Sequence, residues 1–176
     1  MKIAVAQIKP SRDVGTNIKL HEQVIQLAMS YRVGSLFFSE LSLTGYEPEL
    51  ANELATTPSD ARFNGFQELS DSNTITIGLG MPIQGHAGIH ISMLVFQANQ
   101  PKQTYAKQQL HADERPYFIS GDEQLILTVD KSKLAPAICY ESLQANHALN
   151  ARELGADMYI ASVAKSQNGI AKAIAH

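Results

Sequence analysis

Strand-like and helical segments alternate at both ends of this chain, and this alternation constrains its fold more than any other feature. Each end shows a strand–helix–strand pattern, in which an apolar run is followed by an amphipathic stretch and by a second apolar run. The predicted segments are strand Lys2–Ile8, helix Val14–Tyr31, strand Val33–Phe38, strand Lys133–Ile138, helix Ser142–Leu154 and strand Asp157–Val163. Because such units form parallel strands covered by helices, the chain is predicted to be a layered α/β domain with a mixed sheet.

The middle of the chain has a different, antiparallel pattern. Ser59 is predicted to cap a helix whose inward face carries Phe63, Phe66 and Leu69, which we interpret as core residues. Short strands separated by turns follow, at Thr74–Met81, Ile89–Ala98, Gln103–Ala106 and Gln124–Val129. A long polar loop, Gln108–Gly121, interrupts them and has the character of a functional loop.

Composition excludes several classes of protein. A length of 176 residues with 44% hydrophobic and 18% charged residues suits one domain, residues 1–176, with a substantial core. A net charge of -3 argues against the positively charged surface that binding of nucleic acid requires. One cysteine excludes an intramolecular disulfide framework and fits a reducing compartment. With no signal-like segment or long apolar run, the sequence predicts a cytoplasmic protein without a membrane partner.

Three of the predicted strands end at residues with reactive side chains. Glu40 follows the strand at 33–38, Lys107 follows 103–106, and Cys139 follows 133–138. Taken singly, Cys139 reads as a small buried hydrophobe, and the two charged residues read as solvated surface groups. The carboxyl ends of parallel strands lie along one edge of a sheet, however, so the three side chains could meet in one pocket. A thiol at the start of the helix predicted over 142–154 would also be favoured as a thiolate.

Other chemistry is less well supported. His111, in the long loop, could form a Cys–His pair with the thiol, and spacing alone leaves this alternative open. His86 and His90 are four residues apart, but their glycine-rich surroundings are not helical, which argues against a zinc pair. Gly78-Leu-Gly80 lacks the following helix that a phosphate-binding loop requires.

The three strand ends and their flanking residues resemble the nitrilase, or carbon–nitrogen hydrolase, superfamily, whose catalytic set is Glu–Lys–Cys. The similar segments occur in the family's order along most of the chain. They are Lys2–Gln7; Glu40 with Leu43-Thr-Gly-Tyr46; Tyr105-Ala-Lys107 with Leu110, Glu114, Phe118 and Gly121; and Ile138-Cys-Tyr-Glu141 with Gly155-Ala-Asp157 and Ala161-Ser162. Together they make the resemblance specific, although any one of them would be an ordinary coincidence.

The resemblance implies an α-β-β-α sandwich with mixed sheets and a thiol hydrolase of small amides or carbamoyl compounds. It implies that Cys139 is the nucleophile, Glu40 the general base and Lys107 the oxyanion partner, with no cofactor or metal. Glu114 would orient Lys107, the alternative being an exposed loop carboxylate paired with Arg115. The resemblance also places Tyr46 and Tyr140 at the substrate pocket, with the backbone N–H of Tyr140 as a second oxyanion donor.

The sequence departs from the family pattern around this site. After Cys139 it reads Ser142-Leu-Gln-Ala instead of an Arg-Phe-Pro-Glu-like stretch, and Val163-Ala-Lys165 stands where an aromatic residue often follows. These departures leave the substrate open, whereas Tyr140 in the place of a Trp favours amides over nitriles.

The chain stops earlier than the family pattern does. An unclosed helix predicted at Asn168–His176 suggests that the C-terminal part of the family fold is absent and that a homo-oligomer covers the exposed surface. Two alternatives to an amide hydrolase therefore remain, a catalytically impaired binding or scaffold protein and a Cys–His thiol enzyme of another family.

Overall fold

The computed structural model describes residues 2–164 and contains two sheets. The larger sheet has the strand order β1-β2-β3-β4-β5. Its strands are β1 (Ile3–Ala6), β2 (Ser35–Phe38), β3 (Thr76–Gln84), β4 (Ile89–Phe96) and β5 (Gln103–Ala106). The first three strands are mutually parallel, whereas β4 and β5 are antiparallel to their neighbours, so this sheet is mixed as expected.

The smaller sheet has the order β6-β7-β8 and is also mixed. Its strands are β6 (Leu127–Val129), β7 (Ser132–Ile138) and β8 (Met158–Ser162), with β6 antiparallel and β8 parallel to β7. The crossover from β7 to β8 runs through a 3-10 helix, η3 (Cys139–Leu143), and helix α4 (Ala145–Glu153). The reactive strand ends thus come from both sheets, Glu40 and Lys107 from the larger and Cys139 from the smaller.

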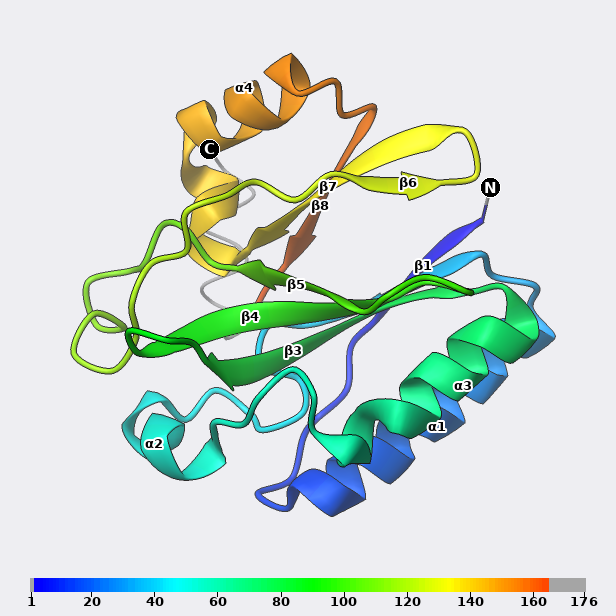
Figure 1. The fold of residues 1–176 in the computed structure, drawn as a ribbon, viewed down its shortest axis with the longest axis horizontal. Helices are drawn as coiled ribbons and strands as arrows, with labels where there is room; N and C mark the ends of the chain where they lie inside the picture. Colours follow the sequence, from blue (N-terminus) through cyan, green and yellow to red (C-terminus); the bar gives the residue numbers. More distant parts are fainter. Residues whose placement is uncertain (1, 165–176) are drawn as a thin grey trace.

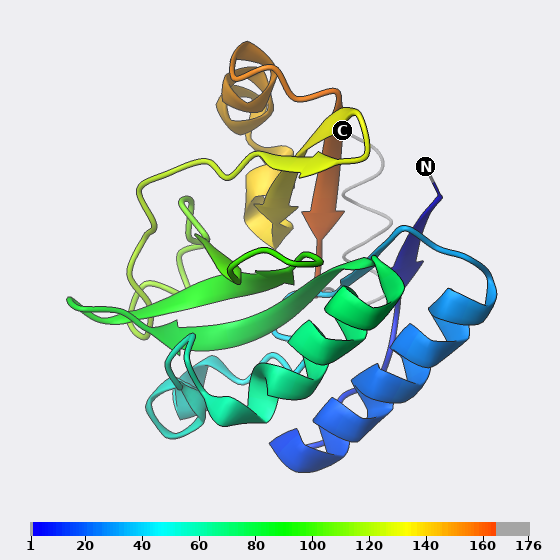
Figure 2. The same ribbon diagram turned by 45° about the vertical axis from the view of Figure 1, so that its right-hand side comes forward.

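The elements form four layers, in the order α-β-β-α (Figure 1). Helices α1 (Val14–Ser30) and α3 (Asn64–Asn73) lie side by side under the larger sheet, and both views show the smaller sheet stacked on its opposite face (Figure 2). Helix α4 lies outside the smaller sheet. The predicted layered sandwich is therefore confirmed for the described residues.

Two apolar clusters hold these layers together, and strand alternation assigns each side chain to one of them. On β2, Phe37 faces the smaller sheet and packs with Leu134 and Ile138, whereas Phe38 faces the helices and packs with Phe66. These side chains are at most 2% exposed. The core thus extends on both sides of the larger sheet, as the apolar, non-alternating sequence of β2 requires.

Several predicted boundaries were wrong. The helix predicted over 142–154 is divided, because Gln144 has extended backbone angles (φ -104°, ψ 104°) that end η3 before α4 begins. Asp60, not Ser59, caps the 3-10 turn that leads into α3, since its carboxylate accepts from the backbone N–H of Arg62. The prediction also missed a short helical segment, 48–54.

The strand predicted over 124–129 is shorter at its start and covers only Leu127–Val129. The helix predicted at 168–176 lies outside the described residues.

Candidate active site

Tight backbone packing fixes the position of Glu40 after β2. A Cβ atom on Gly80 would lie 2.2 Å from the backbone nitrogen of Leu41 and 2.9 Å from the carbonyl carbon of Glu40. The backbone N–H of Leu43 donates to the Gly80 carbonyl (3.0 Å), and Leu41 itself adopts a positive φ of 50°. Gly80 is thus a close-packing residue that supports Glu40, and not part of a phosphate-binding loop.

Lys107 lies directly after β5 and is completely buried. Its backbone N–H donates to the Ile91 carbonyl, and its own carbonyl accepts from the N–H of Gly121, both at 2.8 Å. Its ammonium group donates to Glu40 Oε1 at 2.7 Å and to Glu114 Oε1 at 2.6 Å. The structure therefore brings together Glu40, Lys107 and Glu114, which come from two strand ends and the long loop.

Glu114 is 1% exposed, so the alternative of a solvated loop carboxylate was wrong. Its second oxygen accepts from the backbone N–H of His111 (2.7 Å), and the Tyr46 hydroxyl donates to Oε1 (3.1 Å). Burial, followed by the nearby Glu114 and Glu40 carboxylates, raises the pKa of Tyr46, so its hydroxyl stays protonated and acts as a donor.

The pKa values of both Glu40 and Lys107 are raised, but for opposite reasons. Burial raises the pKa of the Glu40 carboxyl, and the favourable interactions with Lys107 only partly offset that rise. Burial would lower the pKa of the Lys107 ammonium, but the attraction of Glu40 and Glu114 outweighs it and the net shift is upward. One buried cation thus faces two carboxylates, which keeps the ammonium charged, while burial makes Glu40 accept a proton more readily than an exposed carboxylate does.

Cys139 follows β7 and is 8% exposed. Its φ of 48° lies in the left-handed region, an uncommon conformation for a residue with a side chain and one that clusters at functional sites. A hydrogen bond between the Cys139 and Glu40 side chains lowers the pKa of Glu40 slightly. The thiol therefore belongs to the same cluster, although it lies in a five-residue 3-10 helix and not at the start of the long helix that we expected.

The end of β8 joins the two sheets beside this cluster. The Ser162 hydroxyl donates to the carbonyl of Phe38 (2.8 Å), and the backbone N–H of Ala164 lies 3.4 Å from Glu40 Oε2. The segment that departs from the family pattern, 163–165, therefore begins next to the predicted general base.

Glu141 is the residue that the sequence interpretation left without a role. Its side chain is completely buried and accepts hydrogen bonds from three backbone N–H groups and from the Tyr105 hydroxyl. The sequence gives one indication that Glu141 is buried: this carboxylate lies two residues after the cysteine and directly follows an apolar segment.

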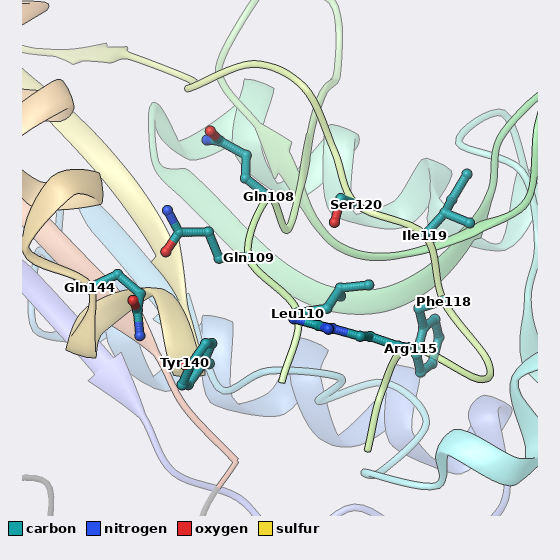
Figure 3. A pocket seen from close by; sticks show the side chains of 9 residues that line it. All are labelled: Gln108, Gln109, Leu110, Arg115, Phe118, Ile119, Ser120, Tyr140 and Gln144. Atoms are coloured by element: carbon teal, nitrogen blue, oxygen red, sulfur yellow. The ribbon is translucent and has the colours of Figure 1, made fainter. Parts of the chain in front are cut away.

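A polar cavity of about 570 Å³ lies beside the cluster (Figure 3). One wall is the loop after Lys107, and the other is the segment after Cys139. The lining residues are Gln108, Gln109, Leu110, Arg115, Phe118, Ile119, Ser120, Tyr140 and Gln144. Tyr140 thus lines a cavity. The side chains of Glu40, Lys107 and Cys139 are not among the lining residues, which instead include residues that follow Lys107 and Cys139 in the chain.

His111 and His147 each have hydrogen-bond partners other than the thiol. The His111 side chain is 57% exposed, is hydrogen-bonded to Asp113, and meets the Tyr140 ring edge-on. His147 is buried between the hydroxyls of Tyr105 and Tyr159 at 2.7 Å each.

Within residues 2–164, no group of three or more His, Cys, Asp or Glu side chains is arranged to hold a metal ion. None of the helices described for this chain is long and apolar enough to cross a membrane.

The site thus combines a buried Lys between two carboxylates with a thiol hydrogen-bonded to one of them, which are the residue types that the resemblance to carbon–nitrogen hydrolases implies. The sequence profile described as "Carbon-nitrogen hydrolase" matches residues 2–173. The chain therefore belongs to the carbon–nitrogen hydrolase family, within the nitrilase superfamily.

Solved structures agree with this assignment at the level of the fold. An amidase from Nesterenkonia sp. has a TM-score of 0.82 and 18% sequence identity, and the match covers 97% of this chain and 68% of the amidase. A mutant of the Nesterenkonia sp. AN1 amidase in complex with butyramide has a TM-score of 0.83 and 19% identity, over 97% and 68% of the two chains.

A glutamine-dependent NAD+ synthetase from Acinetobacter baumannii has a TM-score of 0.79 and 20% identity, over 93% of this chain and 32% of the synthetase. No curated protein sequence matches this chain.

Proposed function

We propose that this protein hydrolyses a small amide or carbamoyl compound through a thioester on Cys139. The observation that carries this proposal is the buried ammonium of Lys107, 2.7 Å from Glu40 and 2.6 Å from Glu114, with Glu40 also hydrogen-bonded to Cys139. A similar amidase binds butyramide, which supports a small amide as the substrate class.

In the first half of the reaction, Glu40 takes the thiol proton while the sulfur of Cys139 attacks the carbonyl carbon of the amide. The raised pKa of Glu40 suits this step, because a carboxylate of higher pKa takes the thiol proton more readily. Glu40 then gives the proton to the leaving nitrogen, the C–N bond breaks, and ammonia or an amine departs. The acyl group remains on the sulfur as a thioester.

Lys107 stabilises the negative charge that develops on the carbonyl oxygen. An ammonium has three N–H donors, and Glu40 and Glu114 accept from two of them, which leaves the third for the oxyanion. The backbone N–H of Tyr140 is the proposed second donor. Glu114, held in turn by Tyr46, keeps the ammonium in place.

In the second half, Glu40 removes a proton from water, and the resulting hydroxide attacks the thioester carbon. The C–S bond breaks, the carboxylic acid leaves, and the proton returns from Glu40 to the sulfur of Cys139. Each group is thereby restored, and the reaction needs no further reactant.

Ammonia release over a panel of ω-amides, carbamoyl amines and nitriles tests the proposal, with iodoacetamide labelling of Cys139 measured against pH in parallel. We expect turnover of at least one amide, and a fall of at least about 10²-fold in Glu40→Gln because the base is lost. We also expect Glu40→Gln to change the pH dependence of labelling. A reactive thiol without turnover of any compound would instead indicate a binding protein or another thiol enzyme, and unchanged labelling would refute the assignment of Glu40 to proton transfer.

A further inference from the structure

The two carboxylate oxygens of Glu141 hold two different segments of the candidate active site. Oε1 accepts from the backbone N–H groups of Gln108 (2.6 Å) and Gln109 (3.3 Å), the two residues that follow Lys107. Oε2 accepts from the backbone N–H of Ile138 (2.6 Å), the residue that precedes Cys139. A single side chain therefore connects the backbone beside the ammonium to the backbone beside the thiol.

We propose that Glu141 is a positioning residue that sets the distance between Lys107 and Cys139. The inference rests on the proposed function, since the distance matters only if the ammonium stabilises charge in a reaction at the thiol. Lys107 belongs to the larger sheet and Cys139 to the smaller, so no secondary-structure element fixes their separation. In Figure 3, Gln108 and Gln109, whose backbone Glu141 holds, line one side of the polar cavity, and Tyr140, which follows Cys139, lines another.

A buried network holds the Glu141 carboxylate itself in place. The Tyr105 hydroxyl donates to Oε2 at 2.9 Å and is hydrogen-bonded to His147, which is in turn bonded to the Tyr159 hydroxyl. Burial raises the pKa of Tyr105 and lowers that of His147, so both are neutral partners at neutral pH. A carboxylate fixed in this way can impose its geometry on the two backbone segments.

The chemistry of these contacts requires a carboxylate and not merely a polar side chain. In Glu141→Gln an NH2 group replaces one of the two oxygens. If it takes the place of Oε1 it meets the N–H groups of Gln108 and Gln109, and if it takes the place of Oε2 it meets that of Ile138. A donor then faces a donor in either orientation, and one of the two connections is lost.

The test compares Glu141→Gln with a partial-loss variant, Tyr105→Phe, and a control, Ser70→Ala, in urea unfolding, amide turnover and the pH profile of iodoacetamide labelling. Tyr105→Phe removes one hydrogen bond of the same network but leaves both backbone connections. Ser70→Ala removes a buried hydrogen bond to the Ile75 carbonyl (2.7 Å) that lies between α3 and β3, on the helical side of the larger sheet. Every variant is assayed at a temperature at which unfolding shows it to be native.

In Glu141→Gln we expect kcat to fall at least about 10-fold with KM within about threefold, because small displacements of reacting groups are costly while the substrate contacts persist. The pH midpoint of labelling should move upward by at least about half a unit as the ammonium leaves the thiol. Ser70→Ala should stay within about threefold of wild type with an unchanged midpoint. Tyr105→Phe, which removes one of the hydrogen bonds that hold the Glu141 carboxylate, should change turnover and midpoint in the same direction as Glu141→Gln but less. If Glu141→Gln does not fold, Glu141→Asp, which is one methylene shorter, should show the same changes.

A folded Glu141→Gln or Glu141→Asp with an unchanged labelling midpoint would overturn the inference, as would an equal change in Ser70→Ala. The labelling measurement does not depend on turnover. If the wild-type chain hydrolyses no compound of the panel, the proposed function fails, and the midpoint still decides whether Glu141 positions the thiol relative to Lys107.

Discussion

Lys107→Met should destabilise the protein in a way that depends strongly on pH. The substitution keeps a long unbranched side chain in the same space but removes the ammonium that lies 2.7 Å from Glu40 and 2.6 Å from Glu114. Because all three side chains are almost fully buried, water cannot replace the lost cation. Among residues 2–164, two carboxylates would then lie close together in the core without the cation that pairs with both.

The expected magnitude follows from the cost of isolating a buried charge. Removing one partner of a buried ion pair typically costs about 3–5 kcal/mol of unfolding free energy. Burial already raises the pKa of Glu40, and the attraction of Lys107 opposes that rise, so its loss raises the pKa further. A carboxyl whose folded pKa lies above its unfolded value contributes stability below the unfolded pKa and loses it as pH rises through the folded pKa.

The deficit of Lys107→Met relative to wild type should therefore be largest near pH 8 and shrink toward pH 5. Each pH unit of that interval adds up to about 1.4 kcal/mol for one titrating group, so a difference of about 2–3 kcal/mol between the two pH values is expected. Urea unfolding at pH 5 and pH 8 measures it. The double substitution Lys107→Met/Glu40→Gln, which removes one carboxylate as well, should recover much of the loss at pH 8.

Lys102→Met is the matched control, because Lys102 packs over the rings of Phe63 and Phe96 at 5.5 Å and not between carboxylates. Its effect should be small and nearly independent of pH. A Lys107→Met deficit that is equal at pH 5 and pH 8, or no larger than that of Lys102→Met, would refute the reasoning about buried charge.

Three further predictions follow from the same structure. Cys139→Ala should abolish amide turnover while its unfolding free energy stays within about 1–2 kcal/mol of wild type, since the void is small; more than a few per cent of residual turnover would exclude Cys139 as nucleophile. Gly80→Ala should cost at least about 2 kcal/mol in urea unfolding, because its Cβ would meet backbone atoms at 2.2 Å; a native-like stability would show that the neighbouring backbone can move. The chain should sediment as a dimer or larger assembly at micromolar concentration, because Val5 on the edge strand and the nearby Tyr31 are 77% and 64% exposed; a soluble monomer with full turnover would contradict that expectation.

The places of Glu40, Lys107 and Cys139 at strand ends could be predicted from sequence, but the prediction of a shared sheet edge was wrong, because Cys139 follows a strand of the second sheet. An apolar run predicts a strand, and a reactive residue directly after that run is predicted to lie at the end of the strand. The burial of Glu114 could not be predicted, because a loop residue is buried only when other parts of the chain fold over it. Here that environment includes Tyr46, which is 68 positions away in sequence, as well as the ammonium of Lys107, which is seven positions away.

The segment after the cysteine shows a second limit. Residues 142–154 have helical composition throughout, but the carboxylate of Glu141 binds backbone N–H groups of two other segments and Gln144 is extended. Tertiary hydrogen bonds therefore override local propensity at this point. Similarly, the role of Gly80 depends on how closely β3 approaches the backbone of Glu40, which no local pattern encodes.

The charge balance of the buried cluster explains why the proposed reaction suits it. With both carboxylates ionised, Glu40 and Glu114 against Lys107 give one net negative charge, two carboxylates against one ammonium. When Glu40 takes the proton of Cys139, one carboxylate becomes neutral, and the negative charge that it loses reappears on the oxyanion of the tetrahedral intermediate. The net charge of the buried site is thus the same before and after the attack, so the step moves charge toward Lys107 without adding any to a region of low dielectric.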